Sequence, residues 1–141
     1  MTRELTALVE HYLLDWDSRA WAGSYHRLIE LGAQVLPELT RRFVDARDVA
    51  FRAALVELAG QLRSADALPL FETALQDPSP EVWKQSLDGL VALASPASIL
   101  LLEEASRRVP PGTTSAMDWE SWIREALQQA RAAHEARGGA A

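Results

Sequence analysis

The sequence lacks cysteine entirely and has a single lysine, Lys84, among its 14 basic residues. The absence of cysteine excludes a disulfide scaffold, a thiol nucleophile and any cysteine-based zinc or iron–sulfur site. The seven glycines are scattered rather than gathered in a phosphate loop, and no Gly-x-Ser-x-Gly motif surrounds Thr113-Thr114-Ser115. Apolar runs such as Ile99 to Leu102 are far too short to cross a bilayer, and no signal-peptide pattern follows Met1. We therefore expect a cytoplasmic protein with no membrane partner.

The chain also has little positive charge. Its 141 residues, enough for about one domain, contain 20 Asp and Glu against 14 Lys and Arg, a formal net charge of −6. This acidic balance argues against nucleic acid as the main partner. The excess is concentrated in residues 64–105, which carry one basic and seven acidic side chains. Two interpretations stay open: a solvated face that keeps the protein soluble, or a surface complementary to a basic partner.

Apolar residues recur at helical spacing along the whole chain, and no stretch alternates with period two. The pattern predicts helix pairs over residues 3–32, 36–62, 66–94 and 96–136, which we expect to form one domain over 1–136, with a disordered tail at 137–141. Boundary signals that predict the helix ends are a cap at Asp17-Ser18, Gly32, the prolines of Leu36-Pro37 and Ser95-Pro96, a cap at Asp48, and a cap at Asp118 or Ser115.

The helices repeat. A shift of 32 residues places Leu36-Pro37 on Leu68-Pro69, Asp45 on Asp77 and Phe51 on Trp83. Self-similarity at a period of this length is typical of a helical solenoid, in which each helix pair buries its apolar stripe against its neighbours. The predicted fold is therefore all-α: a right-handed α-α superhelix, or solenoid, of about four helix pairs (eight helices).

A family resemblance accompanies this pattern. The segment from Asp77 to Val82 (DPSPEV), followed by Ser86, Leu87, Leu90 and Leu93, resembles the HEAT repeat, and is most similar to the short, phycobilisome-lyase-type unit. The segment from Ser64 to Leu70 resembles the family's turn into a first helix, and the resemblance covers residues 34–105. It implies that the position after Val82 is usually an Arg that ties the repeat turns together. Trp83 stands there instead, with Phe51 as its equivalent, and Arg52 and Lys84 follow one place later.

Five tryptophans are many for this length. Trp16, Trp119 and Trp122 fall on apolar stripes and are predicted in the core. Trp21 and Tyr25, four residues apart, fit either the core or a concave surface. Phe51 and Trp83 either pack between repeat turns or form an aromatic strip on the inner face, flanked by Arg52, Lys84 and Asp88, since aromatic and Arg side chains often anchor interfaces. The candidate protein-binding residues are Trp21, Tyr25, Phe51, Arg52, Trp83, Lys84 and Asp88.

No pattern in the sequence indicates catalysis. The three histidines, His11, His26 and His134, fall on different predicted helices, so no pair has the spacing of a helical metal site. Asp15 and Asp17 face apart on a helix and do not make a carboxylate pair. We therefore expect no catalytic residue, no metal and no cofactor.

The sequence favours a non-catalytic helical-repeat module that binds a protein through the concave face of its second helices, as a monomer or weak homodimer. A special form is a small acidic inhibitor or immunity-type protein that neutralises a basic toxin or nuclease. A unit of a larger assembly, self-associating through Trp119 or Trp21, also stays open. The enzyme alternative is a lyase- or DNA-glycosylase-like HEAT protein. For a glycosylase the resemblance implies a catalytic Asp beside Trp, as Asp88 stands near Trp83, but the acidic charge around them disfavours duplex binding.

Overall fold

The computed structural model describes residues 2–109 and 116–138, and these are helical throughout, without a β-strand. The α-helices are α1 (Arg3–Leu13), α2 (Trp21–Leu31), α3 (Leu36–Asp45), α4 (Val49–Gln61), α5 (Leu68–Ala74), α6 (Pro80–Leu93), α7 (Pro96–Ala105) and α8 (Ala116–Ala136), with short 3₁₀ turns η1 (Gly32–Val35) and η2 (Ala65–Ala67). The all-α prediction is therefore confirmed for the described chain, whereas the handedness of the superhelix stays a prediction.

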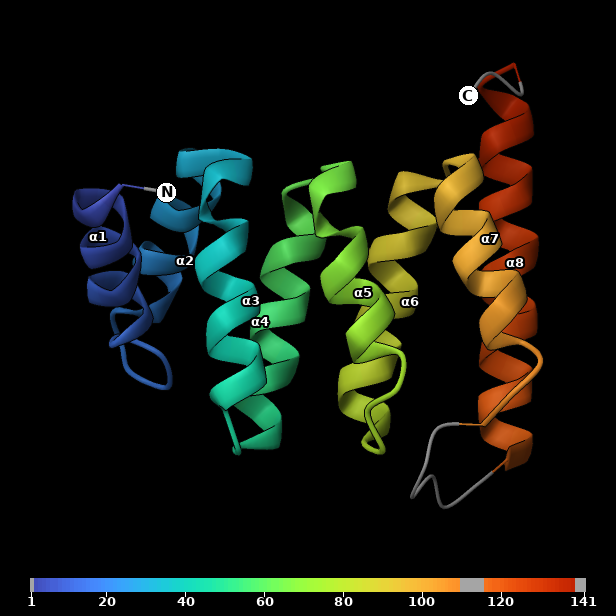
Figure 1. Cartoon of the computed structure of the whole chain (residues 1–141), viewed down its shortest axis with the longest axis horizontal. Helices are drawn as coiled ribbons and strands as arrows, with labels where there is room; N and C mark the ends of the chain where they lie inside the picture. Colours follow the sequence, from blue (N-terminus) through green and yellow to red (C-terminus); the bar gives the residue numbers. More distant parts are fainter. Residues whose placement is uncertain (1, 110–115, 139–141) are drawn as a thin grey trace.

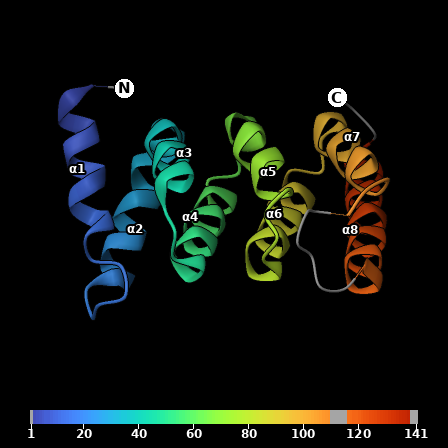
Figure 2. The same ribbon diagram turned by 60° about the horizontal axis from the view of Figure 1, so that its bottom comes forward.

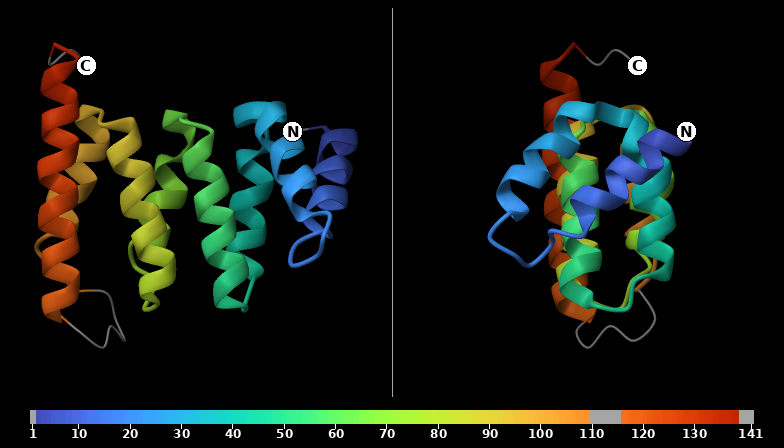
Figure 3. Two further views of the ribbon diagram at one scale, coloured as in Figure 1. Left: turned by 180° about the vertical axis from the view of Figure 1, so that it is seen from behind. Right: turned by 90° about the vertical axis from the view of Figure 1, so that its left-hand side faces the viewer.

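The helices stand side by side in two layers along one long axis (Figures 1 and 2). Seen from behind, α2, α4, α6 and α8 form the nearer layer, with α3, α5 and α7 behind them (Figure 3). Within the nearer layer α2 contacts α4, α4 contacts α6 and α6 contacts α8. These second helices of the pairs therefore form a continuous layer, which we call the second-helix layer.

Local sequence signals account for most helix ends. Proline occupies the first turn of α3, α5, α6 and α7, where its missing N–H costs nothing. The Asp48 side chain accepts a hydrogen bond from the Phe51 N–H at 3.0 Å, as a cap of α4. Gly32 follows the last residue of α2 with a φ of 78°, a conformation that favours glycine. The boundaries predicted at Leu36-Pro37, Ser95-Pro96, Asp48 and Gly32 are confirmed.

The predicted cap at Asp17-Ser18 is wrong, and so is Asp118, one of the two alternatives for the cap of α8. Helix α2 begins at Trp21 rather than after Ser18, because the Ser18 hydroxyl is used inside the preceding turn, where it donates to the Asp15 carbonyl at 2.6 Å. Helix α8 begins at Ala116, which places Asp118 inside its first turn rather than at the cap. Ser115, the other candidate, lies outside the described residues, as do 139–141 of the predicted tail.

The core runs between the two layers for the length of the molecule. Its largest fully buried side chains are Trp83, Trp119, Phe43 and Phe71. The core prediction is confirmed for Trp119, whose indole N–H donates to the Arg108 carbonyl, while Trp16 is half-buried. It is wrong for Trp122, which is 38% exposed, because Trp119 and Ile123 take the buried stripe of α8.

Candidate functional site

Phe51 and Trp83 do not form an exposed strip. Phe51 is 8% exposed and its ring packs at 5.1 Å from that of Trp16, while Trp83 is fully buried against Trp119 at 4.9 Å. The position occupied by both residues points between the layers, so each ring joins its own repeat to a neighbouring one. The prediction of an inner-face aromatic ladder is therefore wrong, and the alternative, packing between repeats, is what the structure shows.

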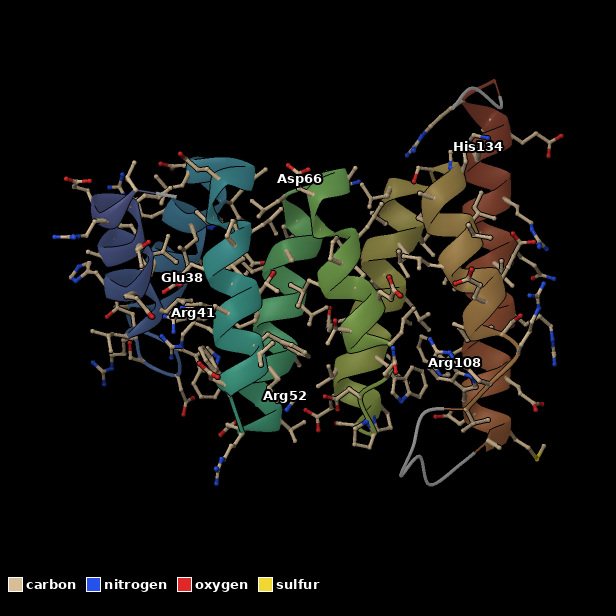
Figure 4. The ribbon with its side chains drawn as sticks, viewed as in Figure 1. Glu38, Arg41, Arg52, Asp66, Arg108 and His134 are labelled. Atoms are coloured by element: carbon tan, nitrogen blue, oxygen red, sulfur yellow. The ribbon has the colours of Figure 1, made fainter. Side chains whose placement is uncertain are left out.

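Arg52 ties two repeat turns together. Its guanidinium pairs with the buried Asp77 before α6, donates to the Ala46 carbonyl at 3.2 Å and lies 4.7 Å from the centre of the Phe43 ring. Asp77 also accepts from the Ser79 N–H at 2.9 Å. Arg52 thus does from one position later what the resemblance assigns to the missing Arg, and it is occupied by the fold rather than available to a partner (Figure 4).

Lys84, the repeat equivalent of Arg52, also reaches into the next unit. Its ammonium lies 3.8 Å from an Asp118 carboxylate oxygen and 4.4 Å from the centre of the Trp122 ring. The Lys84 side chain is 33% exposed and its partner Asp118 is 43% exposed, whereas the Asp77 side chain that pairs with Arg52 is only 4% exposed. Lys84 therefore covers the edge of α8 and is accessible at the surface.

Trp21 and Tyr25 lie together at the start of the second-helix layer. Both are half-buried, and their rings meet edge to face at 5.9 Å. The Tyr25 hydroxyl donates to Glu57 on α4 at 3.4 Å. Burial, followed by the charge and the hydrogen bond of Glu57, raises the pKa of Tyr25 to about 12.

A polar groove lies between α4 and α6 on this layer, and we call it the α4–α6 groove. Its volume is about 410 Å³. It is lined by Glu57, Gly60, Gln61, Arg63, Gln85, Asp88, Gly89 and Ala92. Two glycines allow α4 and α6 to approach each other closely at the base of the groove. A Cβ built on Gly60 would lie 3.5 Å from the Gly89 Cα, so the two helix backbones are almost in contact.

Asp88 is the candidate residue that this groove contains. The residue is exposed, but protein surrounds enough of its carboxyl for burial to raise its pKa. No hydrogen bond or ion pair joins this carboxyl to another residue within the described chain. Of the seven candidate residues, Asp88 thus lines the groove. Tyr25 contacts Glu57, which also lines the groove, and Trp21 packs against Tyr25.

A larger recess, of about 610 Å³, lies elsewhere, where the starts of α1, α3 and α5 meet. Its walls are mainly apolar and small side chains, and Asp66 is the charged residue among those that line it (Figure 4). Three of its polar side chains, Thr2, Gln34 and Thr40, are already hydrogen-bonded to the backbone, so this recess offers a ligand fewer open polar groups than the smaller α4–α6 groove does.

Comparison with known protein families now assigns the fold. The model described as HEAT repeats matches residues 36–132, more than half of the chain. The chain belongs to the HEAT-repeat family. The match begins at Leu36, where α3 starts, and extends into α8. No curated protein and no solved structure matches the chain.

A charged cluster lies where the HEAT-matched region meets the first helix pair. Glu38 on α3 is 3% exposed and accepts two hydrogen bonds from Arg41, each at 2.6 Å, while Glu10 on α1 accepts from Arg41 and Arg42 (Figure 4). Burial and the contact with Glu38 raise the pKa of Glu10, and Arg41 lowers that of Glu38. The cluster ties α1 to α3, and no local sequence pattern indicates it, because Glu10 lies about 30 residues before the other three members.

The groove itself was largely missed as well. Glu57, Gln61 and Gln85 belong to it, and nothing in their local sequence distinguishes them from other surface residues. The available signal was glycine: Gly60 and Gly89 lie inside predicted helices, where glycine is costly unless a close approach requires it. Among the described residues, no cluster of three or more potential ligands could hold a metal ion, and no helix combines the length and apolarity needed to span a membrane.

Proposed function

We propose that this HEAT-repeat chain is a non-catalytic module that binds a partner protein through the face of its second-helix layer. The observation that carries the proposal is the α4–α6 groove. It opens on that layer and brings the carboxyl groups of Glu57 and Asp88 to one recess with two amide side chains. A recess with a few converging polar groups is the usual form of a recognition site.

A basic partner fits this surface best. Residues 64–105, which include Asp88, carry the acidic excess of the chain. Opposite charge on a partner would accelerate association and make it sensitive to salt. This supports, as a second candidate, an acidic inhibitor or immunity-type protein that neutralises a basic toxin or nuclease.

The absence of catalysis is part of the proposal. Glu10 and Glu38 form the carboxyl pair that a hydrolytic mechanism would look to, but Arg41 and Arg42 neutralise it and Glu38 is almost fully buried. Glu38 is therefore closed to a substrate, and the partly exposed carboxylate of Glu10 is already paired with both arginines. The lyase-type subtype, a cytoplasmic location and a monomeric or weakly dimeric state remain predictions; sedimentation at several concentrations tests the last.

The test is retention of a partner from the native host at low and high salt. The groove variant carries Glu57→Gln and Asp88→Asn, and the control carries Glu72→Gln and Glu104→Gln, exposed acids of α5 and α7 that change net charge equally. We expect one stoichiometric basic protein that the wild type and the control retain, and that the groove variant and high salt release. If the groove variant and the control lose the partner equally, net charge alone explains the binding and the proposal is contradicted. The proposal is also contradicted if the wild type retains no protein.

A further inference from the structure

We propose that the α4–α6 groove is a receptor site for one arginine side chain of the partner protein. The inference rests on the proposed function and deepens it by naming the chemical group that enters the groove. Three features of the groove support it: its floor, its charge and its acceptors.

The floor of the groove is backbone. Gly60 and Gly89 bring α4 and α6 so close that a Cβ on Gly60 would already contact the Gly89 Cα at 3.5 Å. Because glycine has no side chain, nothing from Gly60 or Gly89 fills the groove, and its volume of about 410 Å³ lies between the side chains that flank the two glycines on α4 and α6. A recess of this size and depth accommodates a long side chain, and Ala92 offers its aliphatic stem an apolar contact.

The charge of the groove is unbalanced on its walls. Glu57 rises from α4 and Asp88 from α6. Glu57 accepts a hydrogen bond from the neutral Tyr25 hydroxyl, and within the described chain the Asp88 carboxyl has no hydrogen-bond or ion-pair partner. Both residues are exposed, so their carboxylates are accessible from solvent, and a cation that enters the groove can contact acceptors on both walls.

The acceptors favour arginine over lysine. The side chains of Gln61 and Gln85, each with an amide oxygen that can accept, line the same groove as the two carboxylates. A guanidinium presents five N–H donors in one plane and can satisfy several acceptors on two walls at once, whereas an ammonium is a compact point charge. Arg63 also lines the groove, and no ion pair joins it to either carboxylate in the described residues, so it opposes the incoming cation.

Nuclear magnetic resonance titration of the full chain with Nα-acetyl-L-arginine amide tests the site directly. We expect saturable shifts of the Gly60 and Gly89 backbone amide signals. Asp88→Asn and Glu57→Gln should each weaken binding about tenfold, the usual value of a hydrogen bond to a charged group, and Arg63→Ala should strengthen it. Glu72→Gln on α5 is the matched control and should leave the titration unchanged.

Two further probes decide the chemistry. The neutral citrulline analogue should produce no shifts at the two glycines, and the lysine analogue should bind more weakly than arginine. Equal binding of lysine would overturn the assignment to arginine. Shifts spread over the acidic surface, or insensitive to Asp88→Asn, would overturn the site itself.

The two proposals fail in different ways. If the host partner is captured through the groove but arginine amide leaves Gly60 and Gly89 unmoved, the arginine site is wrong and the binding module stands. If arginine amide binds as expected but no host protein is retained, the groove is a cation site and the proposed function is wrong.

Discussion

Helix α6 packs on its two neighbours in opposite ways. Toward α8 it presents Trp83, which meets Trp119 edge to face with both rings fully buried. Toward α4 it presents Gly89, which lies against Gly60 and leaves room for the Phe71 ring. Aromatic packing fills the first junction, whereas at the second the backbones meet and the outer side chains are left to line a groove. The comparison teaches that one helix is packed by aromatic rings on one side and lines the proposed binding groove on the other.

Removal of the tryptophan should have the largest effect. Trp83→Ala deletes a fully buried side chain and is expected to lower the free energy of unfolding by about 3–5 kcal/mol. Urea unfolding followed by circular dichroism measures it. Trp122→Ala, at a 38% exposed position of α8, is the control and should cost far less. Similar losses in the two variants would contradict the view that buried aromatic packing is what stabilises the junction of α6 with α8.

The polar ties across the same junctions should also differ. Arg52 crosses from α4 to Asp77, which is 6% exposed, so Arg52→Ala leaves a buried carboxylate and should cost about 2–3 kcal/mol. Lys84 crosses from α6 to Asp118 at 3.8 Å and is partly exposed, so Lys84→Ala should cost about 0–1 kcal/mol. Urea unfolding of the two variants measures both costs. An equal loss of stability in Lys84→Ala and Arg52→Ala would show that the burial of Asp77 does not make its ion pair stronger than that of Asp118.

The glycine junction should resist even one methyl group. A Cβ on Gly89 would lie 2.4 Å from the Phe71 ring, so Gly89→Ala forces a shift whose cost exceeds its gain in helix propensity, for a net loss of about 1 kcal/mol. Gly23 on α2 has nothing within 4 Å of its Cβ position, so Gly23→Ala should instead gain about 0.5–1 kcal/mol. A stabilised Gly89→Ala variant would mean that the Phe71 ring of α5 can move away from α6 more easily than the geometry indicates.

The repeat pattern predicted the helices well, because apolar spacing and proline at the helix start are local signals. The offset that places Leu36-Pro37 on Leu68-Pro69 corresponds to the starts of α3 and α5. The pattern could not predict which way Phe51 points. Helix α4 is apolar or small on most of its circumference, with Leu55, Val56, Leu58 and Ala59 all buried, so its hydrophobic phase does not separate an inner from an outer face.

The candidate site was predicted less well, because it depends on contacts between repeats. Asp88 was found as a charged neighbour of Trp83, yet the two residues lie on different sides of α6. Glu57 became part of the groove only through the pairing of α4 with α6, which places residues about 30 positions apart on facing walls. A single sequence shows that Gly60 and Gly89 are unusual inside helices, but it does not show that they meet.

The groove side of the comparison can be tested through the pH dependence of stability. Burial raises the pKa of Asp88 above its ordinary value of 3.8, so the folded chain holds this proton more tightly than the unfolded chain does. Its contribution to stability is therefore lost as pH rises through the raised pKa. We expect Asp88→Asn to unfold at higher urea than wild type at pH 7, with the difference vanishing at pH values below the ordinary pKa. A variant that is less stable at pH 7 would contradict this sign.

The smallest expected effect is a titration shift at the edge of the groove. Tyr25 has its pKa raised to about 12, first by burial and then by Glu57. Glu57→Gln removes the charge but leaves the burial, so the pKa should fall only part of the way toward 10. The ultraviolet absorbance of the phenolate reports it, and Tyr25→Phe identifies the step in the titration that belongs to this residue. Glu72→Gln on α5 should leave that step in place. An unchanged pKa in Glu57→Gln would mean that Tyr25 and Glu57 are not in contact in solution, and the α2 side of the second-helix layer would then be independent of the groove.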